Sequence, residues 1–261
     1  GDPSAFVGEW AIAERRAGAI SVRTYFHPDD AGLTDLYLER AGEYLQGFER
    51  TIGAYPYAGF SVVTGPLPVG LGFPGLTYVA RRILPLPFMQ TGSLAHEILH
   101  SWWGGAVGVD YGNGNWAEGL TTYMADYGLA EAEGADAAKA MRLAWLRDFA
   151  ALPAGRDRPL RSFVARDHDA SQVVGYGKAA FVFHMLRRQI GDAAFRAGIR
   201  RFYADHRLQR AGWADLRGSF EAVTGRDLRG FFEQWLDRTG APRLTLAEAN
   251  VSADGHAVDV V

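Results

Sequence analysis

Hydrophobic positions follow a strand-like pattern first and a helical pattern later along the chain. Residues 19–26 (AISVRTYF) are rich in β-branched and aromatic side chains, which favours a strand. From Leu33 to Ile52 apolar side chains recur every three or four residues, so we predict one buried face of a long helix. The next stretch is dense in glycine and proline. Within it we predict two short strands, at residues 60–63 and 76–80.

From residue 92 onward the helical spacing dominates. Strands that come first and helices that come second indicate an α+β protein, in which a small mixed β-sheet packs beside a mostly helical lobe. The predicted helices cover residues 92–107, 116–131, 135–151, 171–190, 192–207, 212–224 and 227–238.

A breaker segment near the end of the chain suggests the domain limits. The residues TGAP at 239–242 interrupt the helical pattern, and strand-like residues follow them. We therefore predict one folded domain over residues 19–240 and the start of a truncated β-rich module over residues 241–261. Residues 1–18 are predicted to be a linker or the end of a preceding domain. We therefore expect these residues to be part of a longer, multidomain chain.

The charge balance narrows the range of partners. The 261 residues include 27 basic and 30 acidic side chains, with no long run of one sign, so we expect no nucleic-acid partner. No apolar stretch reaches the roughly 20 residues that cross a bilayer, so no transmembrane segment is expected. The sequence contains no cysteine, and a metal site must therefore be built from histidine and carboxylate ligands. Nothing in the sequence indicates a cellular compartment.

Residues 96–100 read HEILH and place two histidines four residues apart. On a helix this spacing puts both imidazoles on one face, about 6 Å apart along the axis, where they can bind one cation. Two imidazoles favour a single Zn²⁺ ion, which at a catalytic site takes three protein ligands and leaves a fourth position for water. His96 and His100 are therefore predicted zinc ligands. Glu97 lies beside them without binding the metal, as a general base would.

A third ligand is required, and Glu118 is the candidate. It lies at the start of the next predicted helix, after a glycine-rich turn that can bring it back against the first. The alternative is structural, because Asn115 and Glu118 have the spacing of a helix capping box. Asp110 and Asp126 are both candidates to orient a ligand imidazole from behind.

Four segments of the chain occur in the same order in one known family. They read HEILHSWWG from His96, NWAEGLTTY from Asn115, GYGKAAFVFHMLR from Gly175 and FFEQWL from Phe231. These segments resemble the gluzincin zinc aminopeptidases of the aminopeptidase N type. The resemblance implies that residues 19–240 form a thermolysin-like metallopeptidase catalytic domain.

The resemblance also implies a ligand set and an activity. One zinc ion would be bound by His96, His100 and Glu118, and Tyr176 would be the catalytic tyrosine. From the residues alone, Tyr176 is an aromatic side chain at the head of an apolar helix. The implied function is hydrolysis of peptide substrates, with removal of the N-terminal residue as the default activity.

The chain departs from the family pattern at two points. Seventeen residues separate His100 from Glu118, where the family typically has eighteen, and a one-residue deletion in the turn accounts for this. In the segment GLGFPGL at 70–76, Gly72 stands where the family has a glutamate that pairs with the α-amine of the substrate. Gly72 therefore favours an endopeptidase, or another atypical specificity, as an alternative.

A further alternative is a non-catalytic binding module that keeps zinc for stability. Retention of both Glu97 and Tyr176 speaks against it, because a purely structural zinc site needs neither residue.

Overall fold

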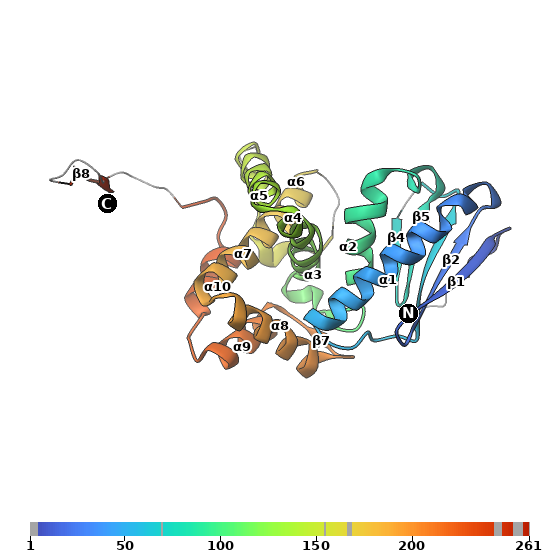
Figure 1. Ribbon diagram of the computed structural model, residues 1–261. Coiled ribbons are helices and arrows are strands. Elements are labelled where there is room, and N and C mark those ends of the chain that lie inside the picture. Colours follow the sequence, from blue (N-terminus) through green and yellow to red (C-terminus); the bar gives the residue numbers. More distant parts are fainter. Residues whose placement is uncertain are drawn as a thin grey trace.

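The computed structural model describes residues 5–68, 70–153, 155–165, 169–242, 247–252 and 258–260. A five-stranded sheet built from the first part of the chain packs beside a lobe of helices built from the rest (Figure 1). The α+β prediction, with a small mixed sheet followed by a helical lobe, is confirmed.

The sheet has the strand order β1-β2-β3-β5-β4. Its inner neighbours, β2 with β3 and β3 with β5, are parallel, whereas both outer pairs are antiparallel. The strands are β1 (Ala11–Ala17), β2 (Ile20–Phe26), β3 (Gly59–Gly65), β4 (Gly70–Phe73) and β5 (Leu76–Ala80).

Strand β4 is not among the predicted strands. Its sequence GLGF has low intrinsic strand preference, since glycine is unfavourable in strands. Pairing with β5 forms it, with Gly72 opposite Thr77. The result is a glycine-rich edge strand whose backbone is accessible along one side.

Residues 11–17 extend the sheet by one strand ahead of residue 19, because β1 pairs with β2 along its whole length. The domain limits themselves stay predictions. In the predicted β module at 241–261, strands β8 (Ala249–Val251) and β9 (Val258–Val260) pair with each other. Residues 243–246, 253–257 and 261 of that module lie outside the described residues, as do residues 1–4.

Helix α1 (Thr34–Thr51) lies along the sheet, as Figure 1 shows, and buries the apolar face that its spacing predicts. Tyr37 and Leu45 are fully buried on that face, and the Tyr37 hydroxyl donates to the carbonyl of Leu84. Burial raises the pKa of the Tyr37 phenol above its ordinary value, so the hydroxyl remains a donor. This packing fixes the sheet against the segment that leads into the next helix.

The helical lobe follows the predicted order of helices, with one clear difference. The helix predicted at 92–107 ends at Leu99. Residues 100–102 form a turn, and a second turn follows at Gly104, whose φ is positive. The helices are α2 (Leu94–Leu99), α3 (Ala117–Thr121), α4 (Tyr127–Glu133), α5 (Ala135–Ala150), α6 (Asp169–Gln172), α7 (Ala179–Ile190), α8 (Asp192–His206), α9 (Trp213–Thr224) and α10 (Arg229–Asp237).

Three wider π-helical turns interrupt these helices. They cover Met89–Ser93 before α2, Thr122–Asp126 between α3 and α4, and Val173–Lys178 before α7. A π turn accommodates one extra residue and is frequent at functional sites, because it changes the direction in which side chains point. Each of the three turns adjoins a segment that carries predicted site residues.

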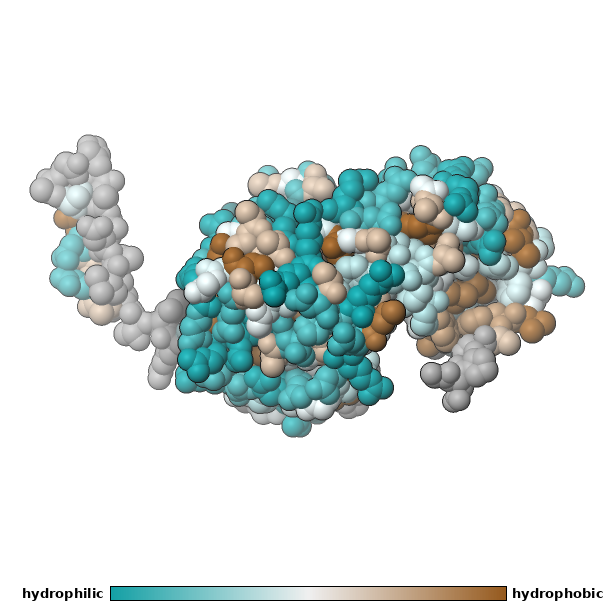
Figure 2. Space-filling model, turned by 90° about the horizontal axis from the view of Figure 1, so that it is seen from below, coloured by the Kyte–Doolittle hydropathy of each residue, from teal (hydrophilic) through white to brown (hydrophobic). Residues whose placement is uncertain are grey.

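The surface differs between the two parts of the molecule. In the view from below, the helical lobe is mainly hydrophilic, and hydrophobic patches gather more over the sheet (Figure 2). Exposed apolar side chains of the sheet include Ile12 on β1 and Leu71 on β4. In the part of the chain that the structure describes, no helix is long and apolar enough to cross a bilayer.

Close contact between α3 and α7 should be essential for stability. A Cβ atom at Gly119 would lie 2.3 Å from the Cβ of Ala179, so Gly119→Ala must push the two helices apart. We expect a loss of about 1–3 kcal/mol in the free energy of unfolding. Gly128→Ala is the control, because a Cβ at Gly128 meets nothing within 4 Å. It should be neutral or stabilising by up to about 1 kcal/mol. Urea unfolding of both variants tests this, and equal stability would contradict it.

Candidate metal centre

Helix α2 turns one face to the core and the other to a cavity. Leu94, Ala95, Ile98 and Leu99 are buried, which leaves His96, Glu97 and His100 on the opposite side. The spacing of four residues brings the two imidazoles together edge to face, with ring centroids 4.8 Å apart. The sequence of this short helix thus presents both imidazoles to the same space.

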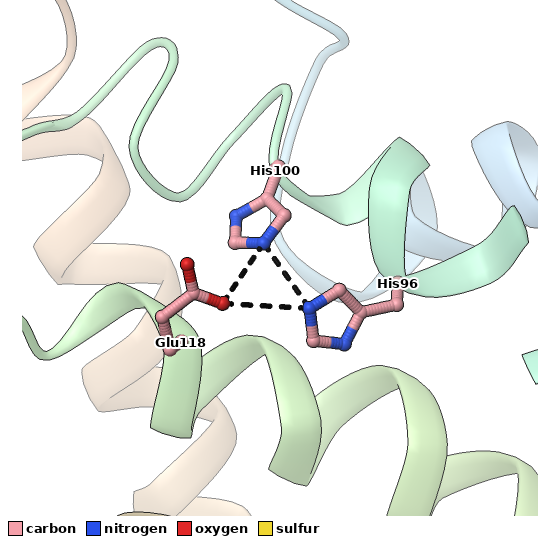
Figure 3. A group of neighbouring side chains, drawn as sticks. All are labelled: His96, His100 and Glu118. Atoms are coloured by element: carbon pink, nitrogen blue, oxygen red, sulfur yellow. Dashed lines mark hydrogen bonds and ion pairs between the residues drawn. The ribbon is translucent and has the colours of Figure 1, made fainter. Parts of the chain in front are cut away.

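Three donor atoms converge from two helices (Figure 3). The Nε2 atoms of His96 and His100 are 3.2 Å apart. The Glu118 Oε2 atom from α3 lies 3.5 Å from the first and 3.3 Å from the second. Ligand atoms about 2.05 Å from a tetrahedral zinc ion lie about 3.3 Å from one another. The spacing of these three atoms therefore fits one zinc ion.

Each imidazole is held from behind through its other nitrogen. The His96 Nδ1 atom lies 2.7 Å from the Asp126 Oδ2 atom, and the His100 Nδ1 atom lies 2.9 Å from the carbonyl oxygen of Trp103. A carbonyl oxygen only accepts, so the His100 Nδ1 atom carries the hydrogen. The Nε2 atom of His100 is thereby left with its lone pair facing the other two donors, which suits a metal ligand.

The charges around His96 are those of a cation site. Burial disfavours its charged imidazolium, but the carboxylates of Asp126 and Glu118 outweigh this effect and raise the pKa of His96 to about 10. Burial also disfavours the charged form of Glu118, yet hydrogen bonds with His100 and His96 hold the pKa of this carboxyl well below its usual range. Without a metal ion, a proton stabilises the converging donors, and a metal must displace it.

Asp126, rather than Asp110, is the residue that orients an imidazole. Asp110 instead accepts hydrogen bonds from the Gly112 amide and the Asn113 side chain in its own loop. In an uninterrupted α-helix, Glu118 and Asp126 would point about 80° apart. The π turn at Thr122–Asp126 absorbs one residue, which brings the two carboxylates to within about 20° of each other. Both can therefore face α2.

The capping alternative for Glu118 is resolved by the contacts at the start of α3. The Asn115 Oδ1 atom accepts from the Ala117 amide at 2.9 Å, and the Asn115 amide donates to the carbonyl of Phe163 rather than to Glu118. The Glu118 carboxylate turns to the imidazoles instead. Within the part of the chain that the structure describes, His96, His100 and Glu118 are the group of three side chains that could hold a metal ion, since their ligand atoms lie within 4.8 Å of one another.

Glu97, Tyr176 and Gly72 line the same cavity, of about 980 Å³, as the three donors. The Tyr176 ring lies nearly parallel to the His96 ring, with centroids 6.2 Å apart. Tyr176 comes from the π turn before α7. A Cβ atom at Gly72 would lie 3.5 Å from the Glu97 Oε2 atom, so β4 forms the wall opposite Glu97. The structure thus brings all the predicted site residues to one cavity.

Comparison of the sequence with models of known protein families shows where this chain belongs. A family model described as the peptidase family M1 domain matches residues 90–235, more than half of the chain. The chain belongs to peptidase family M1. The resemblance to gluzincin zinc aminopeptidases is thereby confirmed. The matched range contains the three converging donors, Glu97 and Tyr176, whereas Gly72 and the sheet precede it.

Family relatives are much longer than this chain. Aminopeptidase N from Streptomyces lividans is 27% identical over 183 residues, a match that covers 64% of this chain and 20% of that protein. The mitochondrial aminopeptidase 2 of Saccharomyces cerevisiae is 23% identical over 269 residues, which covers 93% of this chain and 27% of the relative. The chain therefore spans about a fifth to a quarter of the length of these two family members.

Solved structures share the fold. An M1 zinc metallopeptidase from Deinococcus radiodurans superposes with a TM-score of 0.72 at 24% identity. The match covers 90% of this chain and 53% of that chain. The arrangement of sheet and helical lobe is thus that of an M1 zinc metallopeptidase catalytic domain.

Zinc binding should depend on Asp126 and release a proton. At pH 7 the His96 imidazole, with its raised pKa, is protonated in the metal-free protein and must lose that proton to bind zinc. Zinc affinity should therefore rise as the pH increases from 7 towards 10. Asp126→Asn should lower the affinity by about 10- to 100-fold and weaken this pH dependence.

Calorimetry in two buffers of different ionisation enthalpy measures both the affinity and the proton release. Asp110→Asn is the matched control, because the Asp110 carboxylate accepts hydrogen bonds from Gly112 and Asn113 and does not line the cavity. Equal losses in the two variants would show that Asp126 has no special relation to His96.

Proposed function

We propose that this domain is a zinc metallopeptidase that hydrolyses peptide bonds, with removal of N-terminal residues as its default activity. The observation that carries the proposal is the convergence of the His96, His100 and Glu118 donor atoms within 3.5 Å of one another. Membership of peptidase family M1 supports it. The curated relatives named aminopeptidases support the default activity.

The donor set is suited to one zinc ion. Two imidazole nitrogens and one carboxylate oxygen are the ligands typical of catalytic zinc, with a fourth position left for water. A zinc ion bound there would lower the pKa of that water and polarise the carbonyl of the scissile bond.

Glu97 is the proposed general base. It follows the ligand His96, lines the cavity and does not belong to the group of three converging donors. Because Glu97 does not bind the metal, its carboxylate remains available to accept a proton from the attacking water. Glu97 later returns this proton to the departing amine.

Tyr176 is the proposed donor to the developing oxyanion. Its ring is held beside His96 and makes an edge contact with Phe163, so the phenol has a fixed position in the cavity. The hydroxyl donates a hydrogen bond to the carbonyl oxygen as that oxygen becomes negative. Such a bond is stronger in the transition state than in the ground state and lowers the barrier.

A second candidate function, endopeptidase activity, is favoured by Gly72. This residue faces Glu97 across the cavity, and its lack of a side chain leaves β4 without a carboxylate to bind a free α-amine. An extended peptide that continues past the scissile bond on its N-terminal side meets no side chain at this position.

Removal of the proposed catalytic groups should separate chemistry from zinc binding. Glu97→Gln should lower kcat by about 10²- to 10⁴-fold. Tyr176→Phe should lower kcat by about 10²- to 10³-fold with little change in KM. Both variants should keep one zinc ion, which is measured by elemental analysis. Tyr111→Phe is the control, since this phenol lines the same cavity but is 53% exposed. Unchanged hydrolysis by Glu97→Gln would refute Glu97 as the general base. No hydrolysis by the unchanged, zinc-loaded protein would favour a non-catalytic zinc module.

Matched peptides with free and acetylated N-termini should distinguish the two peptidase activities. Gly72→Glu restores a carboxylate beside the cavity and should raise the ratio of kcat/KM for free over acetylated peptides. We expect an increase of about 10- to 100-fold relative to Gly72→Gln, which has the same size without the charge. Hydrolysis of acetylated peptides only, by the unchanged protein, would refute the aminopeptidase activity. Hydrolysis of free peptides only would refute the endopeptidase activity.

A further inference from the structure

The cavity around the candidate metal centre carries an excess of negative charge. Four carboxylates line it, and no lysine or arginine does so among the residues that the structure describes. Glu118 converges with the imidazoles, Asp126 holds His96, and Glu97 adjoins the metal site. The fourth carboxylate, Asp148, has no part in that arrangement.

Asp148 belongs to a stripe of α5 that faces the cavity. Met141, Trp145 and Asp148 follow one another at spacings of four and three residues, and all three line the cavity. This spacing places them on one face of the helix. The stripe thus combines an apolar surface with a negative charge at one end.

The Trp145 ring is fixed in the cavity wall next to Tyr176. A Cβ atom at Gly177 would lie 3.4 Å from the Trp145 Cδ1 atom, and the ring packs against Tyr127 and Phe181. Asp148 lies about 4.5 Å further along the helix axis. Asp148 is therefore one turn beyond an aromatic side chain that packs against Gly177, the residue after Tyr176.

The carboxylate of Asp148 is available to a ligand. Its ion-pair partner among the described residues is Arg147, at 3.2 Å, and the two side chains are 50% and 75% exposed. Neighbouring residues on a helix do not face each other, and ion pairs between exposed side chains contribute little. A cation from a bound peptide can replace Arg147 at small cost.

The chemistry of the stripe matches a lysine or arginine side chain. Such a side chain has a long aliphatic stem, which can pack on Met141 and Trp145, and a charged end that can pair with Asp148. The face of Trp145 also favours a nearby cation. An α-amine has no such stem and would leave the apolar surface of Met141 and Trp145 uncovered.

We propose that Asp148 binds the cationic side chain of a substrate residue near the scissile bond, so that the enzyme prefers peptides with lysine or arginine there. Asp148 is thus a specificity-determining residue on α5. This inference rests on the proposed peptidase function, and it assigns that function a class of substrate.

Peptide series with and without the positive charge test the proposal. Lysine, arginine, norleucine and glutamate are placed in turn on either side of the scissile bond, and each peptide is prepared with a free and an acetylated N-terminus. Asp148→Asn should lower kcat/KM for lysine and arginine peptides by about 2- to 5-fold, because the carboxylate is half exposed, and should leave norleucine peptides unchanged. Asp148→Lys should shift the preference towards glutamate. Asp136→Asn is the control, because Asp136 is an exposed acid on α5 that does not line the cavity.

Two results would overturn the proposal. If Asp148→Asn lowers kcat/KM equally for norleucine and lysine peptides, Asp148 does not recognise the charge of the side chain. A loss confined to free N-termini, whatever the side chain, would show that Asp148 binds the α-amine instead.

Binding measurements keep this test separate from the test of hydrolysis. The same peptides are titrated into zinc-loaded Glu97→Gln protein and into the double variant that also carries Asp148→Asn. Selective binding of lysine and arginine peptides that is lost in the double variant supports the role of Asp148, even if the unchanged protein hydrolyses nothing. Hydrolysis without any charge selectivity would leave the peptidase function in place and refute the role of Asp148.

Discussion

The convergence of two imidazole nitrogens and one carboxylate oxygen is the constraint on which the rest of this structure depends. Three electron-rich atoms within 3.5 Å of one another repel unless a cation or a proton lies among them. The fold holds them there through contacts behind the imidazoles, from Asp126 and from the carbonyl of Trp103. The fold therefore preorganises these donor atoms for a bound ion.

Packing between helices brings these groups within reach of one another. The absence of a side chain at Gly119 allows α3, which carries Glu118, to touch α7, which follows Tyr176. The π turn after α3 then lets Glu118 and Asp126 face the same helix, α2. Stability and the geometry of the metal centre thus depend on the same helix contacts, so a change in packing at Gly119 would also displace a ligand.

The two walls of the cavity differ in a way that bears on substrate choice. On one side β4 offers glycine backbone and no charge near Glu97. On the other side α5 offers Met141, Trp145 and the carboxylate of Asp148. In the proposed peptidase, this contrast favours recognition of a peptide through its side chains. The motif residues His96, Glu97, His100 and Glu118 match the family pattern, whereas Gly72 departs from it.

The sequence by itself determined the order of strands and helices, the pairing of His96 with His100 on one helix face, and the family. These features depend on local periodicity and on motifs a few residues long. Tertiary structure decided that β4 forms, that Asp126 rather than Asp110 orients His96, and that Glu118 turns to the imidazoles instead of capping its helix. It also decided that Asp148 faces the cavity. Each of these outcomes depends on contacts between segments far apart in the chain, which local spacing does not encode.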